Sequence, residues 1–137
     1  MIRIAVLLLA ALPVPAIAQT LTYDSGKALA LTQGQWTYAA TPTGSESRFG
    51  NALSLRCDRP TRTVTISRPS QQPAALSLAT DSLSKALPPS GRLSAFDPLL
   101  DAIAFSRGRF LVWGGTGPTL VVPSWPEAAR SIEDCRN

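Results

Sequence analysis

Short runs in which apolar and polar residues alternate constrain the fold of this chain more than any other feature. The clearest pair spans 52–58 and 63–68, and the segment between them contains Pro60. Because successive side chains of a β-strand point to opposite faces, a period of two predicts strands with one buried face. The proline-containing break predicts the turn of a hairpin. The inward residues of this hairpin are then Leu53, Leu55, Cys57, Val64 and Ile66.

Other strands are predicted on both sides of this hairpin. Residues 36–38 have strand propensity, and the stretch 41–50 that follows is rich in turn formers and predicts a loop. Alternation over 75–80 predicts another strand. The leucines of 82–87 also fit a helical spacing, but we favour a strand that pairs with 75–80. A last hairpin is predicted from 109–113 and 119–122, joined by the glycine-rich turn 114–118.

Two short helices are predicted in the C-terminal third. Asp97 followed by Pro98 is typical of a helix N-cap and first position, and Gly108 marks the end of the segment. The second helix begins at Pro126, with Glu127 at the positive end of its dipole. The residues expected to face the core are Leu99, Leu100, Ile103 and Ala104 in the first helix and Ala129, Ile132 and Cys135 in the second.

These elements predict an α+β domain. We expect a mainly antiparallel sheet of about six short strands, with the two helices of the C-terminal half covering one face. The single β-rich domain is predicted to span 35–137, preceded by an N-terminal arm over 19–34. The chain is long enough for one such domain with a modest core.

The first eighteen residues have the pattern of a secretory signal peptide. A basic start at Arg3 is followed by the apolar run 4–12 and by the small residues Ala16 and Ala18. The apolar run is too short to span a membrane, which takes about 20 residues. We therefore predict cleavage before Gln19, a periplasmic or secreted product, and no stable membrane anchor after cleavage.

The chain has two cysteines, Cys57 and Cys135. In an oxidising compartment a lone pair of this kind predicts a disulfide. Both residues are expected on inward faces, so the bond would hold the last helix onto the sheet. A disulfide sulfur is neither a nucleophile nor a metal ligand, which leaves a structural role.

Composition excludes several classes of function. The chain has no histidine, so it has no Ser-His-Asp or Cys-His site and no histidine metal ligand. We expect no catalytic residue, no metal and no cofactor, and therefore not an enzyme. The formal charge is +4, or +3 once Arg3 is removed with the signal peptide. Nucleic acid is not expected as a partner of an exported protein.

Four arginines lie close together in the sequence around the first hairpin, and they could attract anionic envelope polymers. Because the group is interrupted by Asp58 and alternates with apolar residues, we favour a solvated rim of the hairpin. The four residues are Arg56, Arg59, Arg62 and Arg68.

A candidate binding site lies between the first predicted helix and the strand that follows it. Ser106, Arg107 and Arg109 bring a hydroxyl and two guanidiniums together, which could hold a carboxylate or a sugar phosphate. Trp113 and Trp125 bracket the last hairpin and could stack on a sugar. The alternative interpretation is a helix end, an edge strand and two core tryptophans.

The segment 97–110, together with 125–127 and 132–136, resembles the C-terminal half of small exported proteins of unknown function from Gram-negative bacteria. It is also similar to the invasion-associated locus B family in its early Trp36 and in a strand that ends at Cys57. The resemblance implies a compact β-rich periplasmic domain and no catalytic residue. One cysteine pair is fewer than that family's pattern.

The sequence therefore favours a non-enzymatic exported protein that binds a ligand or maintains the envelope. Its partner would be an envelope component or another protein. The alternative is a proteinaceous inhibitor of an envelope hydrolase such as lysozyme, which would also use a small exported domain held by a disulfide.

Overall fold

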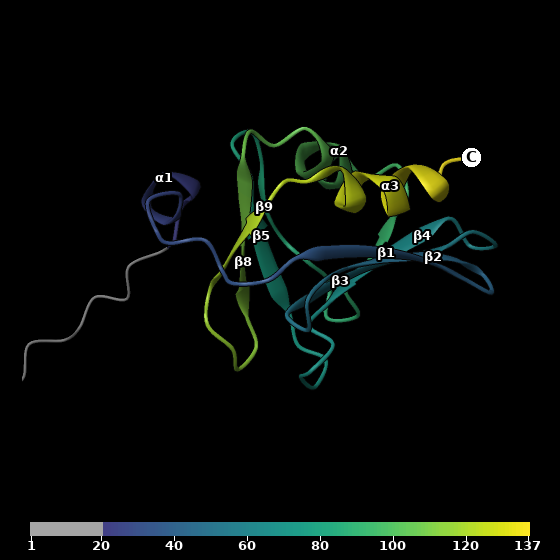
Figure 1. Ribbon diagram of the computed structural model, residues 1–137, viewed down its shortest axis with the longest axis horizontal. Helices are drawn as coiled ribbons and strands as arrows, with labels where there is room; N and C mark the ends of the chain where they lie inside the picture. Colours follow the sequence, from purple (N-terminus) through teal and green to yellow (C-terminus); the bar gives the residue numbers. More distant parts are fainter. Residues whose placement is uncertain (1–20) are drawn as a thin grey trace, which may run out of the picture.

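The computed structural model describes residues 21–137, which form nine strands in two antiparallel sheets and three short helices (Figure 1). The mainly antiparallel α+β class is thus confirmed, with more strands than the six or so that were expected. The predicted signal peptide lies outside the described residues.

The larger sheet has the strand order β1-β2-β3-β4-β7, and its first four strands are a simple meander. The predicted hairpin of β3 and β4 is confirmed, with Cys57 opposite Val64 and Leu55 opposite Ile66. The five strands are β1 (Trp36–Thr41), β2 (Gly44–Phe49), β3 (Leu53–Asp58), β4 (Thr63–Ser67) and β7 (Arg92–Ser94).

The sequence did not predict β2 and β7. The expected loop over 41–50 is wrong, because β2 pairs with both β1 and β3. Its inner face carries Ser45 and Ser47, which are fully buried and hydrogen-bonded, so the strand lacks the apolar alternation that marks a half-buried strand. β7 has only three residues, of which Leu93 alone is buried.

The smaller sheet has the order β6-β5-β8-β9. The chain leaves the larger sheet after β4, forms the predicted β5–β6 hairpin, returns to add β7 to the larger sheet, and then crosses back for β8 and β9. The two sheets are therefore interleaved in sequence. The four strands are β5 (Leu76–Ala79), β6 (Ser84–Ala86), β8 (Arg109–Gly114) and β9 (Leu120–Pro123).

Helices α2 (Pro98–Ala104) and α3 (Pro126–Asp134) lie on one face of the larger sheet, beside the smaller sheet (Figure 1). The predicted N-cap is confirmed, since the Asp97 side chain accepts a hydrogen bond of 2.9 Å from the Leu99 amide. Within the described residues, no helix covers the opposite face of the larger sheet. The buried residues of α3 are Ala128, Ser131 and Ile132 rather than Ala129.

The expected disulfide is present between Cys57 of β3 and Cys135, which follows α3, with a Cα–Cα distance of 5.5 Å. Both cysteines belong to the main core, which contains apolar residues from the two sheets and from α2 and α3. The bond therefore joins the C-terminal helix to the middle strand of the larger sheet.

Residues 21–34, including α1 (Tyr23–Gly26), pack on the side of the smaller sheet that faces away from this core (Figure 1). Tyr23 joins a small apolar cluster with Leu111 of β8. A hydrogen bond of 2.9 Å from the Thr32 amide to the Val121 carbonyl continues the contact along β9. The smaller sheet is thus covered on both faces.

Candidate functional site

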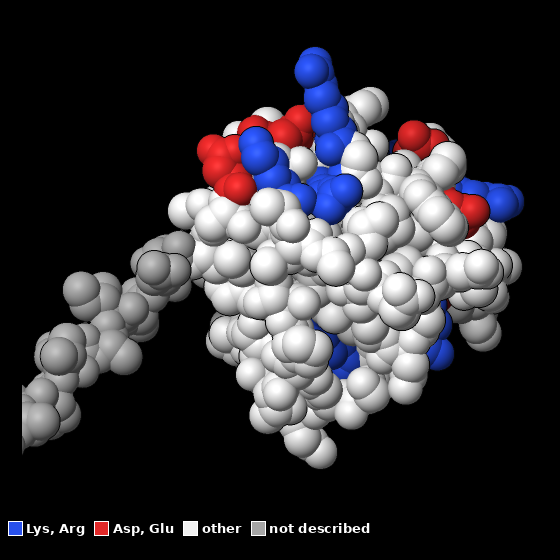
Figure 2. All heavy atoms as spheres, turned by 60° about the vertical axis from the view of Figure 1, so that its left-hand side comes forward, with Lys and Arg blue, Asp and Glu red and all other residues white. Residues whose placement is uncertain are grey.

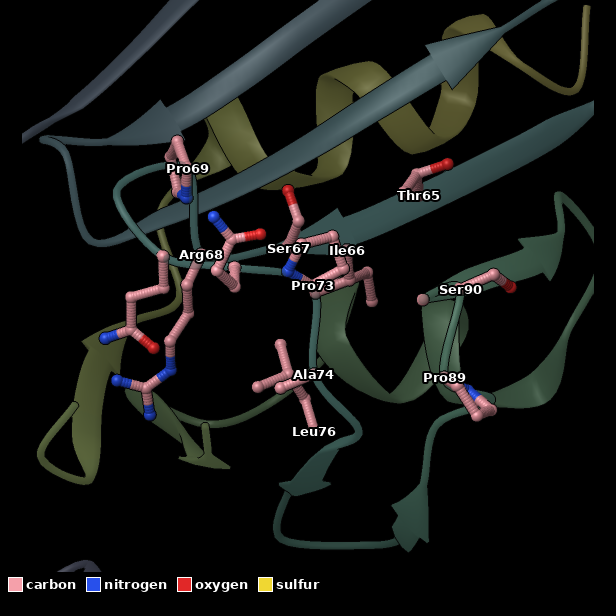
Figure 3. Close-up of a pocket in the computed structure, with 13 residues that line it drawn as sticks. Thr65, Ile66, Ser67, Arg68, Pro69, Pro73, Ala74, Leu76, Pro89 and Ser90 are labelled. Atoms are coloured by element: carbon pink, nitrogen blue, oxygen red, sulfur yellow. The ribbon is translucent and has the colours of Figure 1, made fainter. Parts of the chain in front are cut away.

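A cavity of about 280 Å³ lies where β4 runs past its short neighbour β7. Its walls come from the end of β4, from the loop over 69–74 and from the turn that precedes β7. In Figure 3, Pro89 and Ser90 lie on one side of the cavity and the side chain of Arg68 on the other. Proline rings and aliphatic side chains alternate with hydroxyl and amide groups along the wall.

Arg68 is the charged residue of this cavity, and it is only 6% exposed. Its guanidinium donates hydrogen bonds to two main-chain carbonyls, from Nη1 to Pro118 at 2.8 Å and from Nη2 to Val112 at 3.4 Å. Its buried Nε has no hydrogen-bond partner. Among the residues that the structure describes, no carboxylate forms an ion pair with Arg68.

A buried guanidinium without a counter-ion is costly, because two carbonyl dipoles replace its hydration only in part. This burial lowers the pKa of Arg68 from its usual value. An arginine nevertheless keeps its charge at neutral pH. The site therefore holds a positive charge with no anionic partner among residues 21–137, together with an Nε–H group that makes no hydrogen bond.

The β8–β9 turn holds the guanidinium through the Pro118 carbonyl, and Gln71 binds the same turn. The Thr116 amide donates to Gln71 Oε1 at 3.2 Å. A side chain at Gly117 would meet the ends of the Gln71 and Arg68 side chains, so any larger residue there would require both of them to shift. Arg68 and Gln71 also line a second hollow of about 350 Å³ on the side of Thr32. Arg68 and Gln71 are thus shared by the walls of the two hollows.

Hydroxyl and amide groups accompany the Arg68 guanidinium in the wall of the cavity. Its hydroxyl groups come from Thr65, Ser67 and Ser90, and none of the lining residues is acidic, so no general base stands beside them. A guanidinium with a free N–H, neighbouring amides and hydroxyls matches the acceptor oxygens of a carboxylate or phosphate.

The sequence did not single out Arg68, and the interpretation of the four arginines as a solvated rim is wrong for this residue. Arg56 and Arg62 are exposed, and Arg59 forms an ion pair of 3.8 Å with Asp134, whereas Arg68 is buried. The period of two that places Val64 and Ile66 inward also places Arg68 inward. Extending the alternation of this strand by two residues beyond Ile66 would therefore have predicted that Arg68 is buried.

Of the predicted site residues, Ser106 and Arg109 lie together but serve the fold. The buried Ser106 hydroxyl donates to the Arg109 carbonyl at 2.7 Å. Arg109 Nη1 donates to the carbonyls of Lys27 and Leu29 at 3.0 and 3.3 Å, which holds the arm against the smaller sheet. Both polar groups already have main-chain partners.

The other three predicted residues are spread along the smaller sheet: Arg107 precedes β8, Trp113 lies near the end of β8, and Trp125 follows β9. Arg107 is exposed, Trp113 packs beside the small cluster that includes Tyr23, and Trp125 is the half-exposed N-cap of α3. Figure 2 brings the side of the smaller sheet forward and shows charged side chains gathered along the upper edge of this face, above a largely uncharged area. None of the five residues lines the Arg68 cavity or the hollow beside Thr32.

No family model, curated protein or solved structure matches this chain. The similarity to exported Gram-negative proteins and to the invasion-associated locus B family stays a prediction from the sequence. Within residues 21–137, no helix is long and apolar enough to cross a membrane. The same residues contain no group of three or more acidic or cysteine side chains placed to hold a metal ion.

Proposed function

We propose that this protein is an exported, non-enzymatic binding protein and that the Arg68 cavity is its ligand site. The observation that carries the proposal is a guanidinium, 6% exposed and without an acidic partner in the described chain, in the wall of a cavity. An anionic group of a ligand would supply the missing counter-charge. The cost of burying Arg68 in the free protein would then be offset in the complex.

The ligand group is a carboxylate or phosphate of an envelope component. Nε and an Nη atom of a guanidinium can hold two oxygens of such a group side by side. The proline and aliphatic parts of the wall exclude water from that contact and strengthen it.

Export is part of the same proposal. The disulfide and the lack of a membrane-spanning helix among the described residues are compatible with a protein outside the cytoplasm. We place it in the periplasm or in the medium, processed before Gln19. Mass spectrometry of the exported protein is expected to give a chain that begins at Gln19, and a product that retains Met1 would contradict export by cleavage.

Titration with acetate, galacturonic acid and inorganic phosphate tests the binding site. A ligand at ten times its Kd stabilises a protein by about 1.4 kcal/mol, which raises Tm by roughly 5 °C for a domain of this size. In ¹⁵N NMR the free Nε–H of Arg68 is expected to shift with the same dependence on concentration. If none of the anions moves this signal or Tm, the proposal is wrong.

A second candidate function is inhibition of an envelope hydrolase, and the exposed aromatic residues favour it. Phe96 and Phe105, at the two ends of α2, are 56% and 80% exposed. Exposed aromatic side chains are common anchors in protein–protein interfaces. A lysozyme assay separates the two functions: stoichiometric inhibition that is lost in Phe105→Ser supports the inhibitor, and an unchanged rate counts against lysozyme as its target.

A further inference from the structure

A third hollow, of about 440 Å³, lies on the face of the larger sheet that carries no helix in the described chain. Strand pairing arranges its lining in two rows across β4, β3 and β2. The rows are Thr65, Arg56 and Glu46, and Ser67, Ser54 and Arg48. Three hydroxyls, two guanidiniums and one carboxylate thus face one shallow surface.

The charges of this hollow leave one guanidinium available. Arg48 Nε lies 3.1 Å from Glu46 Oε1, so the two charges form an ion pair, although this Nε makes no hydrogen bond. Arg56 is exposed and forms no ion pair with any described residue. The hollow can therefore accept one further anionic group and several hydroxyls.

This outer hollow adjoins the Arg68 cavity across the end of β4, on the opposite face of that strand. Thr65, Ser67 and Pro69 line both, because β4 extends past β7 and exposes both of its faces there. A strand rises about 3.3 Å per residue, so Thr65 and Arg68 are about 10 Å apart along β4, and their side chains point to opposite faces. A ligand that reaches both must pass the edge of β4 beyond β7, beside Ser67 and Pro69. A molecule that touches Arg56, opposite Thr65, and also Arg68 must be longer than one sugar ring.

We infer that the ligand of the Arg68 cavity is an acidic oligosaccharide, with one acid group at Arg68 and a second at Arg56. The sugar hydroxyls between these groups meet Ser54, Thr65 and Ser67, and the CH faces of a ring pack on proline rings of the cavity wall. This inference rests on the proposed function, since it takes Arg68 as the first anion site. Beyond the proposed function, the inference specifies that the ligand is longer than one sugar ring, carries several hydroxyl groups and has a second acid group.

Calorimetry at physiological ionic strength with galacturonic acid and its trimer tests the inference, with maltotriose as the neutral control. The trimer is expected to bind about tenfold more tightly than the monomer. Arg56→Gln is expected to remove this gain and to leave the affinity for the monomer unchanged. Arg107→Gln, an equal loss of charge at an exposed position outside both hollows, is expected to change neither affinity.

The outcomes separate the inference from the proposed function. Equal affinity for monomer and trimer, or a gain that survives Arg56→Gln, overturns the oligosaccharide, while binding of the monomer at Arg68 still supports the binding site. Tight binding of maltotriose overturns the requirement for acid groups. If acetate and phosphate shift the Arg68 Nε signal and neither galacturonate binds, the anion site stands and the oligosaccharide is wrong.

Discussion

At the scale of single residues, Arg68 and Arg109 show that two arginines with similar hydrogen bonds can have different roles. Both guanidiniums donate to two main-chain carbonyls. Arg109 holds the arm, outside any of the cavities described above, whereas Arg68 lines two hollows and keeps a buried Nε without a partner. The hydrogen bonds of Arg109 are explained by their role in holding the arm. The burial of Arg68 is not explained in this way, because its unpartnered Nε and unpaired charge destabilise the fold.

Arg68→Met is expected to abolish anion binding while changing the free energy of unfolding by no more than about 1 kcal/mol. Removing an unpaired buried charge is favourable, and it offsets the loss of two hydrogen bonds to the carbonyls of Pro118 and Val112. Urea unfolding of the ligand-free protein measures the free energy of unfolding, and titration with galacturonic acid measures anion binding. A loss above about 3 kcal/mol would assign Arg68 to the fold instead.

Asp97→Ala is expected to destabilise the protein by about 1 kcal/mol. The Asp97 side chain caps α2 through the Leu99 amide and pairs with Lys85 at 2.7 Å, so the change leaves a helix N–H without a partner. Asp97→Asn keeps an acceptor for the cap and is expected to recover most of the loss. Equal destabilisation of both variants in urea unfolding would show that the ion pair, and not the cap, stabilises α2.

At the scale of elements, the predictable strands are those whose inner face is apolar. Leu53, Leu55 and Ile66 identify β3 and β4 from the sequence because burial selects apolar side chains at every second position. The sequence did not predict β2, because the inner face of this strand is polar and packs on a polar face of α3. Ser47 Oγ lies 2.7 Å from Ser131 Oγ of α3 and donates to the Glu127 carbonyl. Only the tertiary contact makes these serines suitable for a core.

Loss of the disulfide is the sharpest test of how α3 is held. Cys57→Ser is expected to lower stability by about 3 kcal/mol and Tm by more than 10 °C, because the bond closes a loop between residues separated by 78 positions. Cys135→Ser is expected to match it. Thermal unfolding followed by circular dichroism measures both variants.

The double variant Cys57→Ser with Cys135→Ser is the control for this prediction, and it should be no less stable than either single variant. A bond can be lost only once, so the two effects cannot add. A Tm that a reductant leaves unchanged would show that hydrogen bonds such as that from Tyr38 to Asp134 suffice to hold α3.

At the scale of the whole molecule, the sequence predicted the class and the disulfide but not the arrangement of two sheets. Period-two patterns identify strands locally, whereas the crossing of the chain from β4 to β5 and back to β7 depends on which edges meet in space. The candidate site depends on the same crossing. The cavity exists because β7 stops short of Arg68 and the β8–β9 turn approaches from the other sheet. Neither contact is local in sequence.

The pH dependence of stability tests the molecule as a whole. The chain has no histidine, so no side chain with an ordinary pKa between 5 and 8 is present. For Asp134, burial raises the pKa. The hydrogen bond from Tyr38 and the charges of Arg59 and Arg130 together lower it by more, so the net shift of the pKa is downward. The pKa of Asp97 is also lowered, because Lys85 and the Leu99 amide outweigh its burial.

A carboxyl whose pKa is lower in the folded than in the unfolded state stabilises the fold above the unfolded value, near 3.9, and this contribution disappears as the pH falls through the folded value. The free energy of unfolding in urea is therefore expected to be flat from about pH 5 to pH 8 and to fall below about pH 4. Asp134→Asn should be less stable at neutral pH and lose less on acidification. A steep change between pH 5 and pH 8, or an acid transition unaltered in Asp134→Asn, would contradict this assignment of the titrating groups.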